Sequence, residues 1–331
     1  MTKNKQFLIL LVIIISLKPV RLFANSIEET QTMNASYMKG LSENYYFEQN
    51  ISIDNDQSSV DFFKTIKTVV ILCPYITTGG PESLCQIAQE LKKEGFDVYM
   101  LWMRTGSLIH KKNINGVWYL SVSDIGTAPL VYQNDYNIFN LNKDVALDSS
   151  TLMVVPEIWC DCLTFFDGAK KMIAWLSIQN IHAIDKSRTV RKLIDKKLLY
   201  VMDCLHICNA PCVETALKDW GANPYLVQTY INLKYVEVQK EAKVENTIAY
   251  SPLKGAALGK SFISKYQNYD YISLKGLDIL KMINSLDRAQ IYIDFGHFPG
   301  RERVPREALL RDCVIFIHNV GCARDYDSFP I

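Results

Sequence analysis

The strongest constraint on the fold is an apolar, β-branched run that leads through two glycines into an amphipathic segment. Residues 68–73 read TVVILC, which is typical of a strand buried on both faces of a parallel sheet. Pro81 suits the first position of a helix, and Gly95 is placed to end it. A second apolar run, residues 97–103, follows directly. This strand, helix, strand unit predicts an α/β protein with a right-handed crossover.

The same rhythm continues along the chain and predicts two Rossmann-like domains. We expect residues 67–231 to form the first domain, residues 232–245 a linker, and residues 246–331 the second domain. Further strands are expected at 152–156, 172–177, 198–208, 225–231, 247–250, 271–274 and 290–294, helices at 210–220 and 277–286, and a last helix and strand within 305–318.

The first residues have the pattern of a signal peptide. Lys3 and Lys5 precede an apolar run at residues 7–17, and Ala24 offers a small residue for cleavage. We therefore expect residues 1–24 to be a signal peptide, residues 25–66 to be a polar leader, and the protein to enter the secretory pathway or be secreted. The alternative is a membrane anchor formed by residues 7–17, although this run is shorter than the roughly 20 residues that span a bilayer.

The overall charge argues against two classes of partner. The chain has 36 basic and 35 acidic residues, so it has no global field that would draw it onto nucleic acid or an anionic membrane. An anion site would have to be local. Thr78, Gly79 and Gly80 suit such a site, because they connect a strand end to a helix start, where free N–H groups favour phosphate or carboxylate. The alternative is that the glycines only permit a tight turn.

A cluster of sulfur and nitrogen side chains invites comparison with zinc sites. Cys204, His206, Cys208 and Cys212 are closely spaced, but no second half-site matches a known ligand spacing. We therefore interpret this segment as a strand that runs into a helix, and we predict no metal site.

The most informative segment lies late in the chain, at residues 289–316. A strand enters a loop that contains Gly296, Arg301 and Arg303, and a helix is expected to open at the following proline. Basic groups and glycines at a strand end suit a diphosphate. Glu307, expected in the first helical turn, would accept hydrogen bonds from ribose hydroxyls. The alternative is a solvated charged loop.

Five segments together resemble a bacterial family of glycosyltransferase-like proteins of the GT-B fold. They read GGPE at 79–82, VPEIW at 155–159, WLS at 175–177, YSPLKG at 250–255 and YIDFGHFPGRERVPREA at 292–308. They occur in the family's order and cover residues 67–331, and the last segment is by far the most specific.

The resemblance implies a glycosyltransferase that uses no cofactor and no metal. Its partners would be a nucleotide-sugar, bound by the second domain, and a saccharide or glycan acceptor, bound by the first. Lys254, Arg301 and Arg303 resemble the basic residues near the diphosphate, and Glu307 resembles the glutamate that contacts ribose. Cationic side chains and a helix amino terminus would stabilise the departing diphosphate.

An inverting reaction would also need a base that removes the acceptor proton. Glu157, His182 and His297 are candidates by residue type. Glu157 follows an apolar strand at its carboxyl end, where ligands of such sheets bind. Trp159 and Trp175 would more commonly be core residues than sugar-stacking platforms.

Three departures from the family pattern support an alternative function. Arg311 and Asp312 stand where a small residue and a glycine are expected, and Leu253 replaces a basic residue. The second domain is also shorter than a complete domain of this fold, so we expect it to be truncated. The alternative is a catalytically inactive nucleotide- or sugar-binding protein derived from the same fold.

Overall fold

The computed structural model describes residues 62–104, 109–121, 127–177, 204–219, 221–227 and 229–324. The chain divides into two compact units, with unit 1 ending at Tyr230 and unit 2 beginning at Ile231. The expected signal peptide or anchor, and nearly all of the expected polar leader, lie outside the described residues. Within these ranges, no helix combines the length and the apolar character needed to cross a bilayer.

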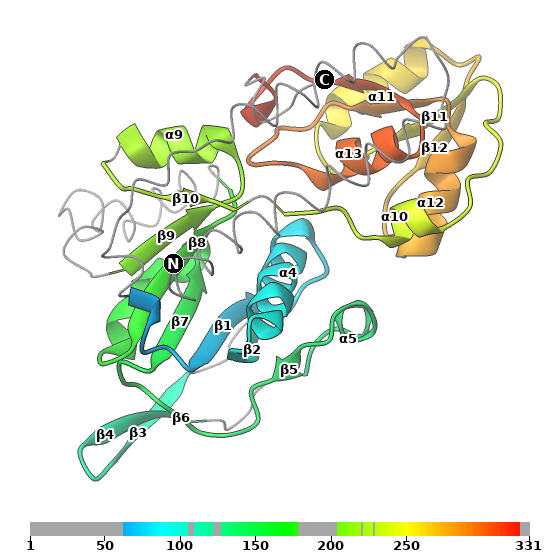
Figure 1. Cartoon of the computed structure of the whole chain (residues 1–331). Coiled ribbons are helices and arrows are strands. Elements are labelled where there is room, and N and C mark those ends of the chain that lie inside the picture. Colours follow the sequence, from blue (N-terminus) through cyan, green and yellow to red (C-terminus); the bar gives the residue numbers. More distant parts are fainter. Residues whose placement is uncertain are drawn as a thin grey trace, which may run out of the picture. The chain divides into compact units, whose positions relative to one another are not determined.

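Unit 1 is built on a seven-stranded parallel sheet (Figure 1). Its strand order is β10, β9, β8, β7, β1, β2, β5. The strands are β1 (Thr68–Pro74), β2 (Asp97–Met103), β5 (Phe139–Asn140), β7 (Thr151–Pro156), β8 (Lys170–Trp175), β9 (Cys204–Cys208) and β10 (Tyr225–Leu226). The parallel sheet confirms the α/β class, and β10 is shorter than the strand expected at 225–231.

Strand β1 shows why this sheet forms. Val69, Ile71 and Cys73 point into the core on the side of helix α4 (Gly79–Lys93), and Val70 and Leu72 point into the opposite core. All five side chains are fully buried, so only a run that is apolar at every position fits this strand.

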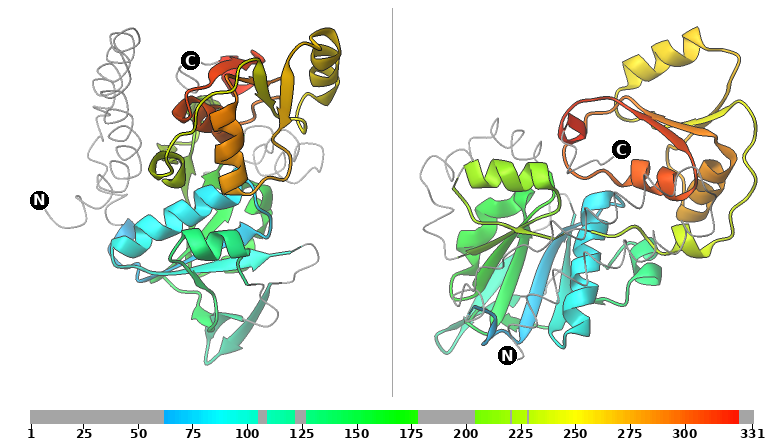
Figure 2. Two further views of the ribbon diagram at one scale, coloured as in Figure 1. Left: turned by 90° about the vertical axis from the view of Figure 1, so that its right-hand side faces the viewer. Right: turned by 45° about the horizontal axis from the view of Figure 1, so that its top comes forward.

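Helix α4 begins at Gly79, two residues before the start expected from Pro81. Proline is tolerated there because the first-turn N–H groups have no partner inside the helix. Helix α9 (Pro211–Asp219) follows β9, close to the predicted 210–220, and the 3-10 segment η1 (Glu157–Phe166) follows β7. Figure 2 shows α4 and α9 beside the parallel strands of unit 1.

The chain between β2 and β7 contains elements that were not predicted. Strands β3 (His110–Ile114), β4 (Val117–Ser121) and β6 (Val145–Ala146) form a small antiparallel sheet, and α5 (Leu130–Asp135) is a short helix.

Unit 2 is a four-stranded parallel sheet in the order β12, β11, β13, β14. The strands are β11 (Thr247–Tyr250), β12 (Asp270–Ser273), β13 (Ile291–Asp294) and β14 (Val314–Ile317), and the helices are α10 (Lys234–Glu237), α11 (Ala256–Lys265), α12 (Ile279–Arg288) and α13 (Arg303–Leu310). Units 1 and 2 are therefore both Rossmann-like, as the sequence predicted. Helix α11 was not predicted.

Residues 232–245, expected to be a linker, belong to unit 2 and are held by the buried side chain of Arg311. The Arg311 guanidinium pairs with both carboxylate oxygens of Asp287, at 2.5 and 2.6 Å. It also donates to the carbonyl oxygens of Tyr235 and Val238, at 3.0 and 2.9 Å. Arginine at this position, where the family pattern expects a small residue, thus fastens residues 235–238 to the unit.

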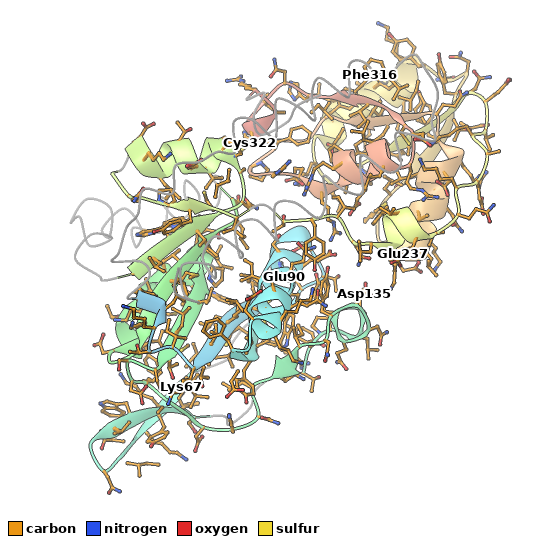
Figure 3. The ribbon with its side chains drawn as sticks, viewed as in Figure 1. Lys67, Glu90, Asp135, Glu237, Phe316 and Cys322 are labelled. Carbon is orange, nitrogen blue, oxygen red and sulfur yellow. The ribbon has the colours of Figure 1, made fainter. Side chains whose placement is uncertain are left out.

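The neighbouring Asp312 has a structural explanation too. Its φ of 58° lies in the left-handed region, which glycine adopts freely and aspartate tolerates. Its carboxylate pairs with Lys240 at 2.6 Å, a second contact with residues 232–245. Glu237 in Figure 3 marks the end of α10, and Phe316 marks the edge strand β14.

Candidate functional site

The sheet order of unit 2 puts a topological switch point at the carboxyl ends of β11 and β13. Strands β11 and β13 are neighbours at the centre of the sheet. The chain continues from β11 to β12 on one side and from β13 to β14 on the other, so the loops after these two strands lead in opposite directions. Ligands of open parallel sheets bind at such a switch point. Helix α11 begins directly after the first loop, and α13 begins after the second.

Two glycines let these two loops touch. Gly255 has a φ of 65°, and a Cβ built on it would overlap the carbonyl group of Phe295 and lie 2.8 Å from the Phe295 Cβ. A Cβ built on Gly296 would lie 2.6 Å from the Lys254 Cβ. Only glycine therefore fits at either position, and the predicted donor-site residues Lys254 and Gly296 are brought into contact.

Asp294 shapes the second loop, and sequence reasoning missed it. Its carboxylate accepts hydrogen bonds from the Gly296 N–H and the Tyr292 hydroxyl, both at 2.7 Å. Burial raises the pKa of Asp294, while these two hydrogen bonds and Lys254 partly oppose the rise. Its position at a strand end, directly before a glycine turn, was the available signal.

Basic side chains and helix starts surround the two loops. Lys254 forms an ion pair with Glu302, and Arg301 and Arg303 are half-buried on the second loop and at the start of α13. In this described region, the starts of α11 and α13 have no side-chain cap hydrogen bond. Their first N–H groups therefore add positive partial charge to the same edge of the sheet.

Glu307 does not lie in the first turn of helix α13, where the sequence predicted it. Helix α13 begins at Arg303, two residues before the expected start, so Glu307 falls beyond the first turn. Its side chain is 0 % exposed and pairs with the Arg303 Nε at 2.6 Å. Burial, and secondarily the Glu307 carboxylate, raise the pKa of Tyr235. Glu307 thus supports Arg303 from below, and its contact with ribose stays a prediction.

His297 is exposed on the second loop. A side chain at Gly321 would approach its Nδ1 to 2.9 Å, so the imidazole lies against the loop after β14. His182 lies outside the described residues.

Unit 1 has a corresponding edge at the carboxyl ends of β1 and β7, which are neighbours. Gly79 and Gly80 begin α4 there, after Thr78, whose carbonyl oxygen accepts from the Tyr132 hydroxyl at 2.9 Å. Neither glycine has a positive φ; among the described residues, a Cβ on Gly79 would meet nothing within 4 Å, and one on Gly80 would make an ordinary 3.6 Å contact with Leu176. Packing of the described residues therefore requires neither glycine.

Glu157 supports the end of β8 at the same edge. Its side chain is 1 % exposed, and its Oε2 accepts from the Leu176 N–H at 3.0 Å. From the other side, the Asn209 Nδ2 donates to the Leu176 carbonyl oxygen at 3.2 Å. The Asn209 Oδ1 is buried and has no hydrogen-bond partner among the residues that the structure describes. Sequence reasoning identified Asn209 only as a helix start and missed this contact.

Trp175 is a core residue, as expected. It is fully buried, and its Nε1 donates to the His206 Nδ1 at 3.0 Å. His206 is therefore engaged by tryptophan. In the part of the chain that the structure describes, no group of three or more His, Cys, Asp or Glu side chains is placed to hold a metal ion.

No protein-family model matches the chain, and no curated protein matches it. Among solved structures, it is similar to sucrose-phosphate synthase from Thermosynechococcus elongatus, with 12% identity and a TM-score of 0.49 over 77% of this chain and 82% of that one. It is also similar to the catalytic domain of starch synthase IV from Arabidopsis thaliana bound to ADP and acarbose, with 9% identity and a TM-score of 0.45 over 79% and 84%. Likeness of this extent leaves the function to be argued from the chain's own residues.

Proposed function

We propose that this protein is a metal-independent glycosyltransferase that binds a nucleotide-sugar in unit 2 and a saccharide or glycan acceptor in unit 1. The observation that carries the proposal is the pair of glycine loops after β11 and β13. They bring Lys254, two further basic side chains and two helix starts without side-chain caps to one sheet edge. The motif resemblance supports the same assignment.

The chemistry of this edge suits departure of a nucleoside diphosphate. Negative charge develops on the diphosphate as the sugar bond breaks, and preorganised donors stabilise it. Lys254, Arg301 and Arg303 would supply cationic donors, and the first N–H groups of α11 would supply partial positive charge. Glu307, paired with Arg303, would hold the Arg303 guanidinium in position. We also propose that Glu307 contributes to binding of the ribose.

The acceptor would bind at the carboxyl ends of β1 and β7. Thr78, Gly79 and Gly80 leave backbone there without a packing requirement, which suits close approach of a hydroxylated ligand. Glu157 or His297 would remove the acceptor proton in an inverting reaction.

Titration calorimetry with a panel of nucleoside diphosphates tests the donor site. One of them should bind, and Lys254→Met should weaken it about ten- to hundredfold, the effect of losing a charged hydrogen bond. Lys265→Met, at the opposite end of α11, is the matched control and should bind like wild type. Failure of every diphosphate to bind, or equal effects of the two variants, would refute the donor site.

The second candidate is an inactive nucleotide- or sugar-binding protein. The observation that favours it is that Glu157, proposed as the base, and Glu307, proposed for ribose binding, are both buried and engaged. Assays with radiolabelled nucleotide-sugars separate the two functions once a ligand is known. Transfer or slow hydrolysis of the donor supports the enzyme, and tight binding without turnover supports the inactive protein.

A further inference from the structure

A β-hairpin extends away from the seven-stranded sheet of unit 1 (Figures 1 and 2). It consists of β3 and β4, joined by Asn115 and Gly116, whose φ angles of 52° and 86° suit a two-residue hairpin turn. The Trp118 carbonyl oxygen accepts from the Leu147 N–H, and residues 147–150 adjoin the start of β1, after Lys67 (Figure 3). The hairpin thus lies at the amino ends of the strands, opposite the Gly79–Gly80 edge.

The end of this hairpin is apolar and exposed. Ile114, Val117 and Trp118, which we call the hairpin tip, are 44%, 38% and 42% exposed. Ile114 and Val117 are cross-strand partners on either side of the turn. Neighbouring exposed apolar side chains on a projecting element cost solvation free energy, and they commonly mark an interaction site.

Basic and aromatic side chains follow directly behind the tip. Lys112 pairs across the strands with Tyr119, and the Lys111 Nζ lies 5.0 Å from the centre of the Trp118 ring. In the described residues 109–121 and 143–146, three lysines and one histidine stand against one carboxylate, that of Asp144. Asp144 is paired with Lys112. The hairpin therefore runs from an apolar end to a basic shaft.

We propose that the hairpin tip inserts into the surface of a lipid bilayer that contains anionic lipids. A narrow convex end with apolar side chains fits the boundary between headgroups and acyl chains, whereas a protein partner would need a matching groove. Tryptophan, tyrosine and lysine are the side chains favoured at that depth, with lysine reaching toward phosphate. Anionic headgroups complement the net positive shaft within a Debye length of about 10 Å.

Quenching of tryptophan fluorescence by brominated lipids tests this in the full chain. The apolar residues 7–17 contain no tryptophan, so quenching reports on other parts of the chain, whatever those residues do. Of the four other tryptophans, Trp102 and Trp175 are buried, Trp159 is half-buried, and Trp220 lies outside the described residues. Vesicles of brominated phosphatidylcholine with phosphatidylglycerol should quench the fluorescence of wild type, and Trp118→Phe should remove the larger part of that quenching.

A paired variant and a control complete the test. In the double variant Ile114→Ser/Val117→Ser, the lipid concentration that gives half-maximal quenching should rise about tenfold, because two apolar side chains are lost. Leu130 lies on α5 and is 74% exposed, and the fluorescence of Leu130→Ser should be quenched as in wild type. No quenching of wild type, as a protein-binding tip would give, overturns the proposal. Quenching that Trp118→Phe leaves undiminished, or that Leu130→Ser reduces as much as the paired variant does, overturns it too.

Discussion

Replacing Gly255 with alanine should destabilise unit 2 far more than the same change at Gly276. Both glycines have left-handed backbones, with φ of 65° and 69°. A Cβ on Gly276 would meet none of the described residues within 4 Å, whereas one on Gly255 would overlap the carbonyl group of Phe295. The left-handed penalty of about 1–2 kcal/mol applies to both variants. Only Gly255→Ala adds an overpacking cost of about 1–3 kcal/mol, since the Phe295 backbone must move.

The free energy of unfolding, measured by urea titration, separates the left-handed backbone penalty from the overpacking cost. We expect a loss of about 2–5 kcal/mol for Gly255→Ala and about 1–2 kcal/mol for Gly276→Ala. Gly255→Ala should also lose nucleoside diphosphate binding, because the two loops separate, while Gly276→Ala should retain it. Equal losses of stability in the two variants would show that the loops after β11 and β13 do not touch as described.

Three further predictions concern buried carboxylates. Asp287→Asn leaves the fully buried Arg311 without its counterion and should cost about 3–5 kcal/mol in urea unfolding; a loss below 1 kcal/mol would contradict the buried pair. Asp294 has a raised pKa, so its folded form binds a proton more readily than the unfolded chain. Its contribution to stability is therefore greatest below its ordinary pKa of 3.8 and is lost as pH rises through the folded value. The stability of wild type relative to Asp294→Asn should rise on acidification from neutral pH, and a constant difference would refute this. Glu157→Gln keeps an acceptor for Leu176 N–H and should cost less than about 1 kcal/mol, whereas Glu157→Leu should cost about 1–3 kcal/mol; similar losses would contradict the hydrogen bond.

The parts of the fold that could be predicted are the strands in which most side chains are buried. Strands β2 and β11 have the expected bounds and β1 extends one residue further, because apolar runs in a parallel sheet leave little freedom of register. The β3–β4 hairpin lies on the surface, where polar residues such as Lys112 hide the alternation. Its Asn115–Gly116 turn was nevertheless a usable signal. Helix α11 was missed because Gly255 and Gly259 weaken the helical pattern.

The candidate site was predicted only as a set of residues. Contact between Lys254 and Gly296 depends on β11 and β13 being neighbours, and sheet order arises from packing of the whole unit. Glu307 was misplaced because Pro305 was interpreted as the first helical residue, when α13 begins at Arg303. A shift of two residues moves a side chain by about half a helical turn, which here turns it from the loop toward the core.

The proposed function requires that unit 2 bind a nucleoside diphosphate on the loops after β11 and β13. Hydrogen exchange of the full chain, measured by mass spectrometry with and without each nucleoside diphosphate of the panel, tests it most directly. We predict slower exchange in peptides that cover residues 251–260 and 295–305, with β14 unchanged. Slower exchange confined to unit 1, or no change with any nucleotide, would contradict the claim.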